Sequence, residues 1–535
     1  YEYLISNFAA NAGKKAGEFY TPHEVSLLMS EIVADHLKDR KEIQIYDPTS
    51  GSGSLLINIG RSISKHMDDE NNIKYYAQEL KQNTYNLTRM NLIMRGILPS
   101  NIKTRNGDTL EDDWPYFEDS DPIGTYNPLY VDAVVSNPPY SQNWDPDGKD
   151  TDPRYARFGL APKSKADYAF LLHDLYHVKP DGIMNIVLPH GVLFRGGEEG
   201  NIRRNLIENN HIDVIIGLPA NIFFGTGIPT IIMVLKQKRD NTDVLIIDAS
   251  KGYIKEGKNN KLQASDIKRI ADTVAARVDV PKYSRVVTRE EIRENEYNLN
   301  IPRYVDSSEA PESWDLYSSM FGGVPKKELE DLSDYWEAFP NLKATLFREI
   351  SKEHVSVIEG DLGDIINNHP DVVSFKENYK MAFKGFSSLL YNHLIEGMEE
   401  LNISKEEAIL SDEIFSQLSS VPLVDRYHAY QLLDDQWENI TIDLEMIQTE
   451  GFEATKQVDP NMVTKKKKGK DVEVQEGWVG RILPFDLVQW TYLPKETKAL
   501  KDKEDRLIQV TVEQQEILDS LTDEDKSDLD RVLND

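Results

Sequence analysis

The sequence predicts an α/β fold, with a largely parallel sheet and crossover helices, followed by a mostly α-helical C-terminal region. Two observations carry this prediction. Between about residues 17 and 250, short β-branched apolar runs alternate with helical patterns, which is typical of parallel strands joined by helices. From Trp314 to Met446, Leu, Glu, Lys and aromatic residues recur at helical spacing with few β-branched runs, so we expect an all-helical module there.

The expected strands follow one another at regular intervals in the first region. They are Ile43–Tyr46, Lys74–Gln78, Ala133–Val135, Ile183–Leu188, Val214–Leu218, Ile231–Leu235 and Val244–Asp248. The polar stretch Asn300–Ser313 contains two prolines and marks a boundary. We therefore predict an α/β domain over residues 1–305, a helical module over 306–460, and a basic loop with a helical tail over 461–535.

Two segments of the last part have open interpretations. The run Lys465–Lys470 (KKKKGK) is interpreted as a solvated mobile loop, with a DNA contact as the alternative. The tail Lys498–Asp535 carries apolar residues in an amphipathic pattern, namely Leu500, Leu507, Ile508, Ile517, Leu518 and Leu521. This pattern suits docking on a partner helix, and packing within the tail explains it equally well.

Composition excludes several classes of function. The 535 residues include no cysteine, which rules out disulfides, thiolate zinc sites and a cysteine nucleophile. A net charge of -30 argues against this chain alone gripping a phosphate backbone, so a basic partner is expected. No apolar run approaches the roughly 20 residues that span a bilayer, and Tyr1–Ala10 does not resemble a signal peptide. We expect a soluble cytoplasmic protein without a membrane partner, and we expect that a portion preceding the helical-looking Tyr1–Ala10 is missing.

The strongest single motif is Val131–Tyr140, in which an apolar strand runs directly into Asn137-Pro138-Pro139-Tyr140. Open α/β sheets bind ligands at the carboxyl ends of their strands. The amino group of a base is a poor nucleophile because its lone pair is delocalised, and the Asn137 side-chain oxygen and the Pro138 carbonyl can accept its two N–H bonds. The prolines hold the backbone extended, and Tyr140 offers a flat face for a flipped-out base. A plain strand-to-turn exit is the alternative.

A glycine-containing loop follows the first expected strand. Residues 43–56 read IQIYDPTSGSGSLL, so Asp47 precedes a loop with Gly51 and Gly53 and then an apolar helix start. Glycines let the backbone approach a ligand closely, and the helix N-terminus offers free N–H groups. A dinucleotide or phosphate loop is the rival interpretation, but the spacing is not GxGxxG and no P-loop Lys follows. A small cofactor without phosphates fits better.

Weaker motifs accompany this loop. Glu79 ends the second strand, where a carboxylate can accept from both hydroxyls of a ribose, although an ordinary surface acid is the alternative. Asp108, in Asn106-Gly107-Asp108-Thr109, can accept from the amino group of a cofactor's adenine, but such a turn needs no function. Thr21-Pro22 stands at a helix start, where Pro is common in any case. The histidines show no metal-ligand spacing, so no metal site is expected; they are His173, His177, His190 and His211.

The segments GEFYTP, DPTSGSG, YYAQEL, NGDTL and SNPPY, in that order, closely resemble the amino-methyltransferases of DNA in the gamma arrangement. The run Lys165–Leu235 is similar to the modification subunits of type I restriction-modification systems. The resemblance covers about residues 1–305, and five ordered motifs are hard to obtain by chance. It implies a Rossmann-like S-adenosylmethionine-dependent methyltransferase sheet that methylates adenine N6 in double-stranded DNA, with S-adenosyl-L-methionine as cofactor.

The resemblance also implies roles for individual residues. Asn137, Pro138, Pro139 and Tyr140 match the catalytic motif, Glu79 matches the ribose acid, and Asp108 with Thr109 matches the adenine contact. The rest of the implied cofactor set is Glu18, Phe19, Tyr20, Thr21, Pro22, His23, Asp47, Thr49, Ser50, Gly51 and Gly53. Phe223 is similar to an aromatic residue that clasps the other face of the flipped adenine. Phe224 is the other choice, and two core aromatics are the alternative.

The implied partners are DNA, a specificity subunit that binds two modification subunits, and a restriction subunit in the full complex. The helical N-terminal domain usual in such subunits is not in this sequence, so we expect DNA binding to depend on partners. Two rival functions remain. Methyltransferases of protein glutamine share the NPPY motif, but they are much smaller and lack the Thr-Pro segment. A scaffold that only holds the specificity subunit would bind its partner without consuming cofactor.

Overall fold

The computed structural model describes residues 21–67, 69–116, 120–121, 123–125, 127–223, 227–308, 314–467 and 470–520. The expected helix at Tyr1–Ala10 and the candidate residues Glu18, Phe19, Tyr20 and Phe224 lie outside this part of the chain. The chain divides into two compact units, one of residues 1–382 with 410–434, and one of residues 383–409 with 435–535. The three-part division predicted from sequence stays a prediction.

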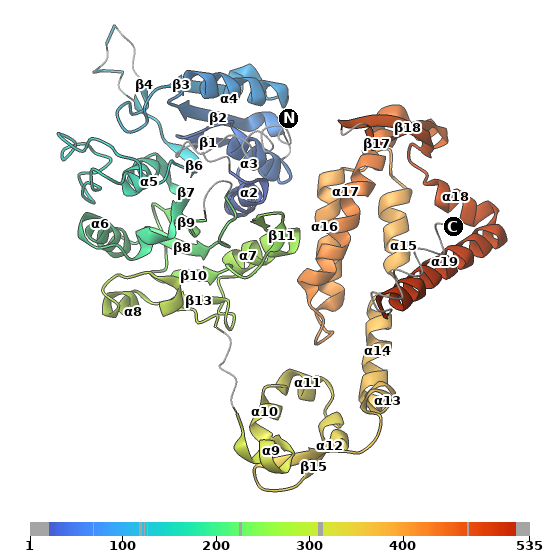
Figure 1. Cartoon of the computed structure of the whole chain (residues 1–535). Coiled ribbons are helices and arrows are strands. Elements are labelled where there is room, and N and C mark those ends of the chain that lie inside the picture. The colour runs from blue at the N-terminus through green and yellow to red at the C-terminus, as the bar shows by residue number, and fades with distance from the viewer. Residues whose placement is uncertain are drawn as a thin grey trace. The chain divides into compact units, whose positions relative to one another are not determined.

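A nine-stranded sheet forms the core of the first unit (Figure 1), in the order β13-β10-β8-β9-β7-β6-β1-β2-β3. Its strands are β1 (Ile43–Asp47), β2 (Ile73–Glu79), β3 (Ile102–Asn106), β6 (Val131–Ser136), β7 (Val178–Pro189), β8 (Ile212–Gly217), β9 (Thr230–Lys236), β10 (Val244–Asp248) and β13 (Ser284–Val287). All seven expected strands are present. The strands β3 and β13 were not predicted.

The sheet is mixed rather than wholly parallel. Strand β9 runs antiparallel to both β7 and β8, and β13 runs antiparallel to β10. The prediction of a largely parallel sheet is confirmed, and these two strands are its antiparallel members. No helix lies between β8 and β9 in the described residues of that connection, and only antiparallel neighbours can be joined without a crossover. Because β9 is buried on both faces, its apolar run looks like that of a parallel strand.

Helices cover both faces of the sheet (Figure 1). One face packs against α2 (His23–Leu37), α3 (Ser54–Ser64), α4 (Gln82–Met94) and α7 (Ala264–Ala276). The other face packs against α5 (Asp167–Tyr176), α6 (Gly197–Glu208) and α8 (Arg289–Glu294). Neighbouring residues of one strand enter different cores: Ile45 of β1 belongs to the first and Tyr46 to the second. Burial on both faces explains why these strands read as continuous apolar runs.

The remaining elements are mostly helical. The helices are α9 (Leu316–Phe321), α10 (Lys326–Glu330), α11 (Ser333–Ala338), α12 (Leu342–Leu346), α13 (Leu362–Asn368), α14 (Pro370–Ala382), α15 (Phe386–Leu390), α16 (Ile403–Leu418), α17 (Arg426–Glu450), α18 (Phe485–Tyr492) and α19 (Pro494–Ser520). Short strands in the first unit are β4 (Pro115–Tyr116), β5 (Asn127–Pro128), β11 (Ile254–Glu256) and β12 (Asn259–Lys261). None of the described helices combines the length and apolar character that a membrane crossing requires.

Two predictions about this region need correction. The segment expected to be all-helical contains a small sheet of β14 (Val324–Pro325), β16 (His354–Val357) and β15 (Phe347–Glu349). The lysine run at Lys465–Lys470 is not simply a loop, because its ends belong to a hairpin of β17 (Val458–Lys467) and β18 (Lys470–Gly480). Exposed strands rich in Lys and Glu carry little periodic apolar signal, and for this reason the sequence did not reveal the hairpin.

Candidate active site

The strand order brings the two strongest motifs together. The sheet is built outward from β1 through β2 to β3 in one direction and from β6 in the other, so the order reverses between β1 and β6. In open α/β sheets, ligands bind beyond the carboxyl ends of the strands at such a switch point. Asp47 is the last residue of β1, and Asn137 directly follows β6. The candidate cofactor loop and the candidate catalytic motif therefore lie side by side.

A cavity of about 350 Å³, called here the first cavity, opens at this edge. The predicted residues that line it are Thr21, Asp47, Thr49, Ser50, Gly51, Glu79, Asp108, Thr109, Asn137, Pro138 and Pro139. The lining also includes residues that were not predicted, among them Leu80, Lys81, Thr84, Gln142 and Phe170. Residues chosen from five separate sequence segments thus share one binding space.

Glu79 is held in place by the glycine loop. The Gly51 N–H donates to one carboxylate oxygen at 3.0 Å, and the Lys81 N–H donates to the other at 2.9 Å. Gly51 has a positive φ of 55°, a conformation that favours glycine. Gly53, with φ 82°, lies outside the lining, and a Cβ there would come within 3.2 Å of the Thr88 methyl group. Gly53 therefore serves the close approach of α3 to α4 rather than direct ligand contact.

Asp47 is buried and only partly satisfied. Its side chain accepts from the Thr49 N–H at 3.0 Å, while its second oxygen and the Thr49 hydroxyl have no partner among the described residues. Burial, with a smaller contribution from the charge of Glu79, raises the pKa of Asp47 to about 8. A ligand that brought a positive charge beside this carboxyl would favour its ionised form.

The Asn137 side chain is oriented by two hydrogen bonds. Its amide nitrogen donates to the Thr21 hydroxyl at 3.0 Å, and its oxygen accepts from the Tyr140 hydroxyl at 2.9 Å. The Tyr140 ring meets Phe223 edge-on, with ring centroids 6.1 Å apart and planes at 85°. Phe223 is 1% exposed, so in this conformation it packs against Tyr140 and presents no face to a ligand.

The backbone directly after the catalytic turn, residues 137–140, is also held in place. Ser141 has a positive φ of 51°, and its N–H donates to Asp167 at 2.7 Å. Asp167 is buried at the start of α5 and accepts from Arg195 at 3.2 Å. A non-glycine residue with positive φ is strained unless its surroundings hold it. The buried carboxylate provides that support directly beside Tyr140.

A second cavity of about 600 Å³ adjoins the catalytic turn on its other side. It is lined by Pro139, Tyr140, Ser141, Gln142, Pro189, His190, Gly191, Phe194, Arg195, Ile228 and Pro229. Pro139 and Gln142 line both cavities. Most of the lining is apolar, and the side chains of Phe194 and Ile228 are exposed. The second cavity therefore suits a flat apolar group placed next to Asn137.

The remaining predicted residues lie apart from both cavities. Pro22 precedes α2 as its N-cap, and His23 begins that helix and lines a different cavity beside Arg61 and Arg95. Of the residues missed, Leu80 and Gln142 stand directly beside predicted motif residues, so a wider window around each motif would have found them. Phe170 lies inside α5 and offers no local signal.

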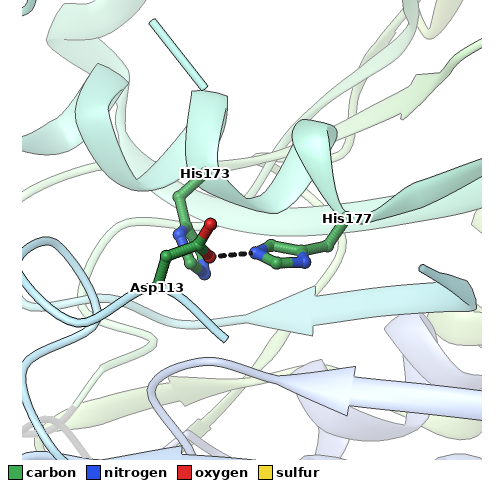
Figure 2. A group of neighbouring side chains, drawn as sticks. All are labelled: Asp113, His173 and His177. Atoms are coloured by element: carbon green, nitrogen blue, oxygen red, sulfur yellow. Dashed lines mark hydrogen bonds and ion pairs between the residues drawn. The ribbon is translucent and has the colours of Figure 1, made fainter. Parts of the chain in front are cut away.

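Two histidines treated as scattered are in fact neighbours. His173 and His177 lie one helical turn apart, and Asp113 comes between them from a distant loop (Figure 2). Their ligand atoms lie within 4.8 Å of one another, which is close enough to hold a metal ion. This cluster of Asp113, His173 and His177 was not predicted from the sequence. Each of the four imidazole nitrogens already has a hydrogen-bond partner, however, and one partner is the cationic Arg154 at 3.1 Å from His173 Nδ1. We therefore interpret the group as a hydrogen-bonded network.

Comparisons with known proteins find similar sequences. The family model described as N-6 DNA Methylase matches residues 1–313. The type I restriction enzyme MpnII methylase subunit of Mycoplasma pneumoniae is 39% identical over 322 residues, 59% of this chain and 58% of that protein. The HindI methylase subunit of Haemophilus influenzae is 30% identical over 377 residues, 68% of this chain and 77% of that protein.

A solved structure is similar as well. The type I restriction-modification system methyltransferase subunit from Streptococcus thermophilus shares 49% identity with a TM-score of 0.53, over 57% of this chain and 62% of that one. The chain thus spans about three fifths of the length of the Mycoplasma and Streptococcus proteins.

Proposed function

The chain belongs to the N-6 DNA methylase family, among the methylase subunits of type I restriction enzymes, and from this premise we propose that it transfers a methyl group from S-adenosyl-L-methionine to N6 of adenine in double-stranded DNA. One observation carries the proposal most strongly. Asn137 and Pro138 line the same cavity as Asp47, Glu79 and Asp108, so a cofactor and an amino group held by the catalytic motif would meet directly.

The first cavity fits the cofactor. S-adenosyl-L-methionine supplies an electrophilic methyl group on a sulfonium and carries no phosphate. Its ammonium group suits Asp47, whose unpartnered oxygen needs a positive neighbour. Glu79 is fixed by two backbone N–H groups and can accept from the ribose hydroxyls. The adenine ring would lie near Asp108 and Thr109, with the exposed Leu80 as an apolar neighbour.

Asn137 is the group that acts on the base. Its side-chain oxygen has two lone pairs, of which the Tyr140 hydroxyl uses one, so the other can accept an N–H of the target amino group. The Pro138 carbonyl would accept the second N–H. Drawing both hydrogens out of the ring plane frees the nitrogen lone pair for attack. Positioning in a water-poor site then supplies most of the rate, and the product nitrogen sheds its proton after transfer.

The second cavity would receive the flipped-out adenine. A base inside a duplex is out of reach, so such enzymes extrude it into a pocket. Tyr140 and Phe194 offer aromatic contact there, while Gln142 lines both cavities and has an amide that can both donate to and accept from a base edge. The role expected for Phe223 or Phe224 stays a prediction.

Partners follow from charge and family. A net charge of -30 weakens contact with phosphates, so a separate subunit would supply most of the DNA grip. We propose a complex of two such chains with one specificity subunit, joined by a restriction subunit in the full enzyme, acting on DNA in the cytoplasm.

The decisive experiment follows the transfer of tritium from labelled S-adenosyl-L-methionine. The acceptor is unmodified genomic DNA, with and without the co-expressed specificity subunit, and the products are digested to nucleosides. Label in N6-methyldeoxyadenosine only with the partner present supports the proposal. Label in protein glutamine would instead support the protein-modifying alternative. Cofactor binding without any transfer would support the scaffold alternative.

A further inference from the structure

A network of mostly buried polar side chains adjoins residues that line the first cavity. Its members, called here the floor network, are Tyr46, Gln78, Asp113, Arg154, His173 and His177, and Figure 2 shows three of them. Tyr46, Gln78, Arg154 and both histidines are less than 5% exposed. Burying this many polar groups is unfavourable unless each is paired, so their arrangement calls for a structural reason.

Arg154 connects the turn that contains Asp108 and Thr109 to the core. Its guanidinium donates to the backbone carbonyls of Thr109 at 3.0 Å and Leu110 at 3.3 Å. The same group pairs with Asp152 at 2.7 Å and donates to His173 Nδ1 at 3.1 Å. A planar fork of five donors can serve all of these acceptors at once, which a lysine cannot do. The turn containing Asp108 and Thr109 is therefore held from below by one side chain.

The two strands that end at cofactor residues join the same network. Tyr46 precedes Asp47, and its hydroxyl donates to Gln78 at 3.0 Å and accepts from His173 at 3.2 Å. Gln78 precedes Glu79, and its amide donates to the Asp112 carbonyl at 2.9 Å. Asp47 and Glu79, two of the candidate cofactor contacts, therefore each stand next to a member of the floor network in the chain.

The histidines complete the hydrogen bonding. His177 is hydrogen-bonded through Nδ1 to the Leu129 carbonyl at 2.6 Å and through Nε2 to the Asp113 carboxylate at 2.8 Å. Burial, and then the charges of its neighbours, lowers the pKa of His173 well below its usual value, so that ring is neutral. An unprotonated Nδ1 on the neutral ring can accept the hydrogen bond from Arg154, and the protonated Nε2 can then donate to Tyr46.

We propose that Arg154 is a positioning residue for the cofactor: through the floor network it fixes the turn that contacts the adenine end, in register with Asp47 and Glu79. The inference rests on the proposed function, because it assumes that the first cavity holds S-adenosyl-L-methionine. A turn held in its bound conformation loses less freedom on binding, and affinity rises for that reason. Arg154 touches no reacting atom, so it should change cofactor binding and leave the chemical step alone.

The test compares two ligands by calorimetry on the full chain. S-adenosyl-L-methionine contains the adenine and ribose as well as the ammonium-bearing methionine part, whereas 5′-methylthioadenosine lacks the ammonium group. Arg154→Lys should weaken both ligands roughly tenfold, because it loses charge-assisted hydrogen bonds to the turn. Asp47→Asn should weaken only S-adenosyl-L-methionine. The matched control Arg157→Lys changes an exposed arginine of the same loop, whose side chain donates a hydrogen bond to Asn209, and should alter neither Kd by more than twofold.

Kinetics separate positioning from general structural support. With the specificity subunit and saturating cofactor, Arg154→Lys should raise the cofactor KM roughly tenfold and keep kcat within twofold per folded site. An unchanged Kd with a lowered Tm would overturn the inference. If Arg154→Lys does not fold, Tyr46→Phe removes one hydroxyl of the floor network and should still weaken both ligands about threefold; unchanged affinities there would overturn it too. Failure of the unaltered chain to bind either ligand would count against the proposed function itself.

Discussion

The two cavities that meet at Pro139 and Gln142 are prepared to different degrees. The first cavity includes several polar groups whose positions are fixed by hydrogen bonds, such as Glu79 between two backbone N–H groups. The second is lined mostly by apolar side chains, and Phe194 and Ile228 on its rim are exposed. Phe223, a candidate wall for the base, is buried against Tyr140.

The two substrates would therefore bind in different ways. A free cofactor can enter a preformed site, where rigid polar groups lower the entropy lost on binding. A base must first leave its duplex, and the cavity that receives it can gain contacts as it closes. Asn137 belongs to the first cavity and to the turn that borders the second, so its replacement should affect the chemistry more than either binding step.

The largest expected effect comes from that shared residue. Asn137→Ala removes the acceptor for the target amino group, and we expect kcat to fall by about 10²- to 10³-fold, the size seen when a preorganised transition-state contact is lost. The Kd for S-adenosyl-L-methionine should change by less than about threefold, because the cofactor contacts remain. Tritium transfer and calorimetry measure the two quantities. Asn143→Ala, an exposed residue of the following loop, is the control, and methylation by Asn137→Ala at the control rate would contradict the mechanism.

The next effect belongs to the first cavity alone. Asp47→Asn removes the carboxylate proposed to pair with the cofactor's ammonium group, and affinity should fall about 100-fold while kcat at saturation changes little. The pKa of Asp47 is raised to about 8, so its carboxyl must lose a proton before it pairs with a cation. Affinity of the unaltered protein should therefore rise with pH up to about 8 and stop rising above it.

The variant provides the control for this pH dependence. Asp47→Asn should show only the decline caused by titration of the ligand's own ammonium group at high pH. Calorimetry between pH 6 and 9 gives both curves. If the affinity of Asp47→Asn for S-adenosyl-L-methionine still rose with pH, a group other than Asp47 would be responsible for the titration.

A smaller effect tests how Asn137 is oriented. Thr21→Val keeps the shape of the side chain but removes the hydroxyl that accepts from the Asn137 amide. One lost hydrogen bond corresponds to about 1 kcal/mol, so kcat should fall roughly fivefold to tenfold. Thr21 also lines the first cavity, and a Kd that rises by the same factor would show that Thr21 contacts the cofactor instead of orienting Asn137. Single-turnover rates at saturating cofactor distinguish the two cases.

The candidate site was predictable where its chemistry is local in the chain. The loop after Asp47, the acid Glu79 and the turn ending at Tyr140 each follow an apolar strand directly, so each could be placed at the same edge of the sheet. The pairing of residues far apart in the chain was not predictable in this way. Asp113, Arg154 and His173 come from two loops and a helix that are separate in the sequence, and only the folded chain brings them together. No periodicity within one segment reports such a contact.

The fold shows the same limit. Seven strands were predicted because each is a buried apolar run, and β3 was missed because its alternating residues include Lys103 and Arg105. The direction of β9 was also beyond reach, since an apolar run buried on both faces carries no mark of parallel or antiparallel pairing. Direction depends on the connection, and the connection to β9 lacks the helix that a parallel crossover needs.

The smallest expected effects come from a matched pair of variants, each of which changes the lining of only one of the two cavities. Leu80 is 55% exposed and lines only the first, whereas Phe194 is 45% exposed and lines only the second. Leu80→Ala should raise the Kd for S-adenosyl-L-methionine about threefold, from lost apolar contact, and leave the KM for DNA unchanged. Phe194→Ala should raise the KM for DNA about fivefold and leave cofactor binding unchanged, since stacking on a base is worth about 1 kcal/mol or more. If both variants altered both constants, binding at one cavity would reshape the other, and the base site would be formed only after the cofactor is bound.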